Sequence, residues 1–346
     1  QSKPEFSSQN LSQMQKVTNT MAKKSPAFLK HIAVFALVVL TFIANPVRAQ
    51  IAVTVTGAAN TTPALSASYT SLSDALTGLN AVTAMTGPVT FTLAAGSSET
   101  APLTGFTVGS ATLNPVLSVT NTVTIVKDAG APTVLNAAAG GTTTPTSAAP
   151  NGILKIVGAD YVTINGLTLT DGNATNPASM EFGLGIFKTG PTDGAQNNTI
   201  QNCIINMQRI NNASGTTPMV EGSVGILMIN STATTATTAI TVTAASGTNS
   251  NNKFYSNTIN GGNYGMALIG FAGTSPFTNC DQGTIVGAST LGNSILNFGG
   301  GAATNPSAGI RTLAQYAISI GYNTVNNNNG AGVNHATTLR GIYLNT

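Results

Sequence analysis

The stretch N-N-T-I-Q-N-C-I-I-N at residues 197–206 decides how the rest of the chain is interpreted. It contains two short β-like runs that are separated by a corner at Asn202 and Cys203. Ile200 and Ile205 lie one in each run, and we expect both to face a common core. Altered copies of the stretch are N-N-K-F-Y-S-N-T-I-N at 251–260, I-S-I-G-Y-N-T-V-N at 318–326 and Y-V-T-I-N-G-L-T-L-T at 161–170. This recurrence predicts a repeat architecture.

A second unit, a glycine followed by apolar residues, alternates with the first. It occurs as G-I-F at 185–187, G-I-L-M-I at 225–229, G-M-A-L-I at 265–269, G-I-R at 309–311 and G-I-Y-L at 341–344. The glycines of successive copies are 40, 40, 44 and 32 residues apart. Such short strands cannot bury an apolar face alone, so we expect each repeat to form one coil, stacked about 4.8 Å from the next. The residues after the glycines would then face inward: Ile186, Ile226, Met266, Ile310 and Ile342.

The composition agrees with many short strands joined by turns. Of the 346 residues, only 7% are charged and 42% are hydrophobic, with 37 Gly and no Trp. Asn and Gly at the corners suit bends with a left-handed backbone. Low-complexity tracts at 140–149 and 231–238 suggest disorder as an alternative. Apolar residues return at regular intervals throughout, which excludes disorder for the whole chain.

The first 49 residues have the features of a targeting segment. Lys23, Lys24 and Lys30 precede an apolar core at 32–44, and V-R-A at 47–49 has the small residues of a cleavage site. We therefore predict a leader over 1–49, with a secretory signal peptide at about 21–49, and a secreted or outer cell-surface location. The alternative is a membrane anchor, which the shortness of the apolar run opposes. We expect no membrane span in the mature chain.

The net charge of +3 divides unevenly between the leader and the mature chain. Residues 1–49 carry six basic and one acidic group, which gives +5, and the rest carries seven basic and nine acidic groups, which gives −2. The mature chain therefore lacks the basic surface that binds phosphate backbones, and we expect no nucleic-acid partner.

The mature chain is expected to begin with a cap and to continue as repeats. Within 50–150, we predict the N-terminal cap and the first coils; parallel β-helix repeats follow over 151–346. One helical face is marked by Leu72, Ala75, Leu76, Leu79 and Val82. Ser71, with Asp74 three residues later, resembles the capping box at the start of a helix. A short helix in this position would cover the open end of the strand array.

The two units together resemble a known fold. N-x-T-I-x-N-x-I-I followed by G-I-x-L looks like the repeat of the right-handed parallel β-helix in pectate-lyase-like proteins. The opening S-Y-T-S-L-S-D-A-L…G-P-V-T-F-T-L, from residue 68, resembles the start of secreted surface proteins of gliding and gut-type Gram-negative bacteria, many of them exported by the type IX system. The resemblance implies an all-β fold, a right-handed parallel β-helix solenoid with a short N-terminal capping helix. It also implies that the chain is the N-terminal part of a longer polypeptide.

In that family pattern, the corner before the last short strand often holds asparagine. Asn257 and Asn323 match the pattern, whereas Leu167 and Cys203 depart from it. We therefore expect no unbroken ladder of asparagines along the coils.

The mature chain shows no clear catalytic or metal-binding cluster. Its nine acids are at least ten residues apart in sequence, although Asp160, Asp193 and Glu221 could approach through loops. His335 is the sole histidine of the mature chain and is interpreted as a turn residue, and no Cys/His spacing suits zinc. We expect no metal and no cofactor. Cys203 and Cys280 could form a disulfide after export, or Cys203 could be a small buried corner residue.

One predicted surface stripe suggests binding. The residues that follow the inward column would face outward, and they include Phe187, Arg311 and Tyr343. Sugars stack on aromatic rings and hydrogen-bond to arginine, so the stripe is a candidate glycan-binding face. The alternative is that loops cover it. We expect a structural or adhesive protein that binds a polysaccharide or cell-surface glycan, with a polysaccharide lyase or glycoside hydrolase as the alternative.

Overall fold

The computed structural model describes residues 49–138, 151–172, 181–211, 221–300, 305–327, 335 and 337–345. Ala49–Thr346 forms one compact unit. The predicted signal peptide lies outside the described residues, apart from Ala49, and the structure says nothing of it. All descriptions below concern the described part of this unit.

Three sheets contain most of the strands. Sheet 1 consists of β1 (Val53–Thr56), β3 (Ser68–Tyr69), β5 (Val89–Leu93), β8 (Val123–Lys127), β11 (Val162–Asn165), β14 (Thr199–Gln201), β17 (Lys253–Tyr255), β20 (Ile285–Val286) and β23 (Ser319–Ile320). Sheet 2 consists of β6 (Ser98–Thr100), β9 (Val134–Asn136), β12 (Thr168–Thr170), β15 (Ile204–Met207), β18 (Thr258–Gly261), β21 (Ser294–Leu296) and β24 (Thr324–Asn326). Sheet 3 consists of β7 (Phe106–Val108), β10 (Gly152–Val157), β13 (Phe182–Lys188), β16 (Val224–Thr232), β19 (Tyr264–Ile269), β22 (Ser307–Leu313) and β25 (Leu339–Asn345).

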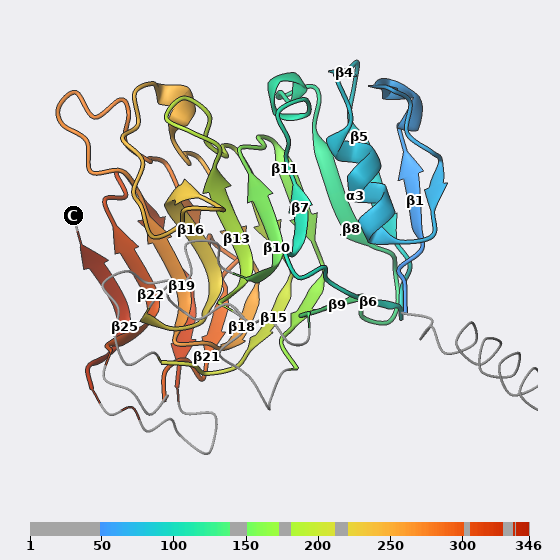
Figure 1. Cartoon of the computed structure of the whole chain (residues 1–346). Coiled ribbons are helices and arrows are strands. Elements are labelled where there is room, and N and C mark those ends of the chain that lie inside the picture. The colour runs from blue at the N-terminus through green and yellow to red at the C-terminus, as the bar shows by residue number, and fades with distance from the viewer. Residues whose placement is uncertain are drawn as a thin grey trace, which may run out of the picture. The chain divides into compact units, whose positions relative to one another are not determined.

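The chain visits the three sheets in a fixed order. From β5 onward each coil contributes one strand to sheet 1, one to sheet 2 and one to sheet 3, which gives seven coils. Strands of successive coils pair in parallel, and Figure 1 shows them following one another in chain order along sheet 3. The predicted parallel β-helix is therefore confirmed. Antiparallel pairs occur at the N-terminal end, where β1 pairs with β3 and β5, and β2 (Thr61–Thr62) pairs with β4 (Ala84–Met85).

Stacked apolar columns fill the interior of the coils. In sheet 1 the register places Ile164, Ile200 and Phe254 next to one another, and in sheet 2 it places Leu169, Ile205 and Ile259 in a second column. All six side chains are fully buried. The inward positions predicted for Ile200 and Ile205 are confirmed, and each coil completes the core of its neighbours.

A column of glycines lies where sheet 3 begins in each coil. A Cβ on Gly265 would lie 2.3 Å from Ile295 Cγ2 and 2.6 Å from the carbonyl oxygen of Gly309. Equivalent approaches link Gly183, Gly225, Gly265, Gly309 and Gly341. The prediction that the glycine series begins at Gly185 was therefore wrong by two residues. The in-phase glycine is Gly183, because Leu184, and not Ile186, pairs with Ile226.

The corners use left-handed backbone and buried asparagine side chains. Asn202 has a φ of 55° and Asn251 has a φ of 59°, as predicted for sharp bends. Asn257, Asn293 and Asn323 form a ladder at the corner between sheets 1 and 2, in which each side chain accepts a backbone N–H from the coil before it. The ladder covers the last three coils, and Leu167 and Cys203 occupy the corner earlier, as the sequence suggested.

The N-terminal cap covers the first strands of sheets 2 and 3. Helix α3 (Leu72–Asn80) begins at Ser71, whose hydroxyl accepts the N–H of Asp74, as predicted. Its N-terminus also donates the Leu72 and Ser73 N–H groups to the buried carboxylate of Glu99 on β6. At its other end, the side chain of Asn80 donates to Thr107 O and accepts from Gly109 N. These two hydrogen bonds give partners to backbone groups at the open edge of β7.

Short 3₁₀ helices lie in the connections, at Ala58–Asn60, Asn114–Val116 and Ala245–Gly247. The last of these lies near the sites described below.

Candidate functional site

The outer face of sheet 3 carries a second apolar core. Phe182, Phe187, Val224, Leu227 and Ile229 project from it and pack into a cluster separate from the interior of the coils. The rings of Phe182 and Phe187 lie 5.3 Å apart and cover Gly185, where a Cβ would collide with both rings. The chain segments between sheet 3 and sheet 1, such as 233–252, contribute Ala233 and Ala236 to the cluster.

The three residues of the predicted stripe differ in how far the structure buries them. Phe187 is fully buried, whereas Arg311 and Tyr343 are partly exposed. Arg311 pairs with Tyr343 across β22 and β25, and its guanidinium carbon lies 5.9 Å from the centre of the Tyr343 ring. Phe187 lies one outward column away, because Gly185, and not Phe187, pairs with Leu227. All three face outward on sheet 3, but Phe187 is part of the second core.

A cavity of 390 Å³ lies on this outer face, over β16, β19 and β22. Its floor contains Ile229, Ile269 and Leu313, which are neighbours in one column. Residues 236, 237 and 239–241 contribute another wall, and Phe271 and Arg311 also line it. A concave and mainly apolar space of this size, with few polar groups, is typical of a small-molecule site.

Arg311 is held by a polar cluster beside the cavity. Its Nη1 donates to the Glu221 carboxylate and, over 2.9 Å, to the hydroxyl of Tyr264. That hydroxyl donates in turn to Glu221 Oε2 over 2.6 Å. Burial raises the pKa of the Tyr264 phenol, and the bond to Glu221 raises it further. Tyr264 therefore stays protonated, which does not suit a phenolate base.

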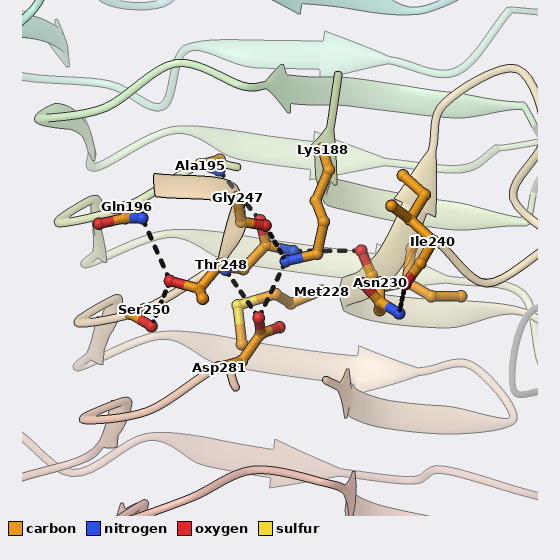
Figure 2. A network of polar contacts seen from close by, with 12 residues as sticks. Lys188, Ala195, Gln196, Met228, Asn230, Ile240, Gly247, Thr248, Ser250 and Asp281 are labelled. Carbon is orange, nitrogen blue, oxygen red and sulfur yellow. Dashed lines mark hydrogen bonds and ion pairs between the residues drawn. The ribbon is translucent and has the colours of Figure 1, made fainter. Parts of the chain in front are cut away.

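One polar atom of the cavity lining lacks a partner. Asn230 is only 4% exposed, and its Nδ2 donates to the carbonyl oxygen of Ile240 over 2.8 Å. Figure 2 shows this bond. Its Oδ1 has no hydrogen-bond partner within the described parts of the chain. A buried acceptor without a partner costs free energy, and a hydroxyl or amine of a ligand would satisfy it.

Sequence reasoning did not find Asn230, and it considered Glu221 only as a possible neighbour of Asp160 and Asp193. Asn230 directly follows the run 225–229, and Glu221 lies four residues before it. A signal was present in G-I-L-M-I and G-M-A-L-I, because a strand buried on both faces has an unbroken apolar run.

The three acids that were expected to approach through loops do not all meet in the structure. Asp160 and Asp193 interact at the corner between sheets 3 and 1, whereas Glu221 lies with Arg311. Burial, opposed by the Gln196 N–H and aided by Asp193, raises the pKa of Asp160 to about 7. Asp193 Oδ2 accepts hydrogen bonds from Thr189 and Asn114. These two carboxylates do not line the cavity.

The two cysteines are buried and free. Cys203 lies in the interior core at the corner before β15, and Cys280 lies in the segment that follows β19, where its sulfur approaches Gly273. The suggested disulfide is thus not present, because the two thiols belong to different parts of the coils.

The other expectations about site chemistry concern metals, His335 and membranes. Among the described residues, no group of three His, Cys, Asp or Glu side chains could hold a metal ion. His335 Nδ1 accepts the N–H of Gly300, and Nε2 lies 3.1 Å from Asn305 O, which is a turn role. Within the same described ranges, no helix is long and apolar enough to cross a membrane.

Comparisons of the chain with protein-family models, with curated proteins and with solved structures found no match. The functional argument therefore rests on the geometry of the site.

Proposed function

We propose that this protein is a secreted or cell-surface β-helix that acts as a scaffold and binds a carbohydrate in the cavity on sheet 3. The observation that carries the proposal is a concave, mainly apolar cavity whose lining includes both Asn230, with an Oδ1 that lacks a partner in the described chain, and Arg311. A sugar hydroxyl can donate to the first and accept from the second. The apolar C–H face of a pyranose suits the floor of Ile229, Ile269 and Leu313.

The charges favour a neutral sugar over an acidic one. Glu221 already balances the charge of Arg311, with the two side chains only 10% and 15% exposed. A uronate would therefore gain little Coulomb energy at this site compared with a neutral hexose. This property also separates the proposal from a lyase that acts on acidic polysaccharides.

The scaffold part of the proposal rests on other features. The basic and apolar leader supports export, and the low content of charged residues suits stacked coils.

Binding can be tested on a glycan array with the full chain and two matched variants. Ala239 is exposed and lines the cavity, so Ala239→Trp should fill the space and weaken binding roughly tenfold or more. Thr238→Trp is the control, because Thr238 is an exposed neighbour that does not line the cavity. Equal binding by both variants, or no binding of neutral glycans by the native chain, would refute the proposal.

A second candidate is a glycoside hydrolase, which the Asp160–Asp193 pair favours. A carboxyl group with a pKa near 7 beside a second carboxylate is the arrangement of a general acid and its partner. Release of reducing sugar by the native chain, and its loss in Asp160→Asn, would establish this function instead. Glycan binding by the native chain without any hydrolysis would leave the binding function in place.

A further inference from the structure

A lysine and an aspartate meet inside the coils, and neither of them lines the cavity. Lys188 Nζ lies 2.9 Å from Asp281 Oδ1, and both side chains are completely buried. Lys188 is the last residue of β13 in the third coil, and Asp281 precedes β20, after the fifth coil. Figure 2 shows the two side chains reaching toward each other across the segment that contains Gly247 and Thr248. The fourth and fifth coils therefore lie between the two residues in the chain.

The other contacts of the pair fix the two reacting groups. Nζ also donates to the carbonyl oxygen of Gly247 over 2.8 Å. Asp281 Oδ1 accepts the backbone N–H of Asn249 over 2.9 Å. Asp281 Oδ2 makes no hydrogen bond of standard length and angle in the described part of the chain, although the Gln315 side chain lies near enough to favour the charged carboxylate. One carboxyl oxygen thus accepts two hydrogen bonds, and the other makes none of standard geometry.

Burial favours the neutral forms of both the Lys188 amine and the Asp281 carboxyl group. It lowers the pKa of Lys188, although the charge of Asp281 opposes the shift. It raises the pKa of Asp281, although Lys188 and the Asn249 N–H oppose that shift. A buried ion pair loses the hydration of two charges, so transfer of one proton from Nζ to the carboxylate is less costly here than in water. The products of that transfer are a nucleophilic amine and a carboxylic acid.

We propose that Lys188 and Asp281 condense to form an intramolecular isopeptide bond. The lone pair of Nζ attacks Asp281 Cγ, and an N–C bond forms while Oδ1 takes up negative charge. The Asn249 N–H, which already donates to Oδ1, stabilises that charge. The C–Oδ2 bond then breaks, and Oδ2 leaves as water with two of the three protons of the Lys188 ammonium group. The amide keeps the other Nζ proton, so one water is released and no oxidant or other reagent is needed.

The surroundings favour the amide product. Lys188 Nζ and the Asp281 carboxyl group are held at hydrogen-bond distance by the packed coils, which replaces an encounter in solution by a fixed geometry. The Gly247 carbonyl, which now accepts a hydrogen bond from Nζ, remains an acceptor for the amide N–H. The isopeptide bond would close a loop over 93 residues and join the third coil to the corner after the fifth.

Mass spectrometry of the full chain tests the proposal. The denatured native protein should be lighter by one water than its sequence, counted from its measured N-terminus. Trypsin should fail to cut after Lys188, so that the fragment 156–209 remains joined to the fragment 254–311. Native protein that is folded but has the uncondensed mass, and that yields separate fragments, would overturn the proposal.

Variants provide the matched control. Replacing both partners, as in Lys188→Met with Asp281→Leu, removes the chemistry and keeps apolar volume, so the fold is expected to persist. This double variant should show the full sequence mass and separate tryptic fragments. Asp281→Asn should still condense, because its amide can leave as ammonia, and it should reach the same mass as the native protein. Condensation in the double variant would show that other residues react.

Discussion

The asparagine ladder at the corner between sheets 1 and 2 makes a quantitative prediction. Asn293 is 1% exposed, and its side chain makes four hydrogen bonds. Its Oδ1 accepts the backbone N–H and the side-chain amide of Asn257, at 2.9 and 3.0 Å. Its Nδ2 donates to Phe254 O at 2.9 Å and to Asn323 Oδ1 at 2.8 Å. The perturbation is Asn293→Ala.

The expected cost follows from the groups left without partners. The variant leaves the Asn257 N–H buried and unpaired, at roughly 1–3 kcal/mol, whereas the Phe254 carbonyl keeps the hydrogen bond from the Gly287 N–H. It also removes the hydrogen bonds from Asn293 to the side chains of Asn257 and Asn323, which keep their bonds to Ile200 O and Val286 O, at about 1 kcal/mol in total. We therefore expect Asn293→Ala to lower the free energy of unfolding by about 2–4 kcal/mol.

Urea denaturation of the full chain measures this change, with Asn206→Ala as the matched control. Asn206 faces outward on β15, and its Nδ2 makes one weak contact with Thr170 Oγ1 at 3.5 Å. Its loss should change the free energy of unfolding by about 0.5 kcal/mol or less. If the two variants are equally stable, the ladder is not an important source of stability and the reasoning fails.

Three other predictions concern the backbone and one carboxyl group. Gly265→Ala should lower the free energy of unfolding by about 3 kcal/mol, because its Cβ meets a backbone oxygen and Ile295; Gly190→Ala, with open space around it, should be neutral in the same urea experiment. Asp160 binds its proton more tightly when folded, so native stability falls as pH rises from about 4 to about 7. Asp160→Asn should therefore be more stable than the native protein at pH 8 and have nearly the same stability at pH 4, as measured by urea midpoints. A difference in stability that does not depend on pH would contradict the raised pKa of Asp160 as its cause. Tyr322 has a left-handed backbone, with a φ of 61°, and its side chain is 74% exposed. Tyr322→Asn should therefore raise the thermal midpoint, because asparagine relieves about 0.5–1 kcal/mol of left-handed strain. An unchanged midpoint would argue against that strain.

The sequence predicted the features that repeat. Period and composition led to the parallel β-helix, to the inward positions of Ile200 and Ile205, and to left-handed corners such as Asn202. The helix at 72–80 was also found, because Ser71 and the apolar spacing are local signals. Each of these features depends on residues that are close in sequence or that recur at regular spacing.

The features that were missed depend on phase and on long separation. The segment F-G-L-G-I-F offers two glycines, and only the packing against Ile205 and the next coil selects Gly183. Asn293 was overlooked because its copy of the first unit is shortened to S-I-L. The pair Lys188–Asp281 is 93 residues apart, and no local pattern links the two. The paths of the intervening segments through the coils decide which residues meet, and those paths depend on tertiary packing.

The segment between β16 and β17 links the cavity to the buried lysine–aspartate pair. Its first part lines the cavity with residues 236, 237 and 239–241, and its last part brings Gly247 and Asn249 against Lys188 and Asp281. Figure 2 shows Asn230 with Ile240 on one side of this arrangement and the buried pair on the other. An isopeptide bond between the third and fifth coils would hold the end of that segment in place. In the chain-entropy description, a crosslink across a loop of this length stabilises by about 5 kcal/mol. The wall of the cavity would thus be held by hydrogen bonds to a covalently joined pair, which suits a preorganised binding surface.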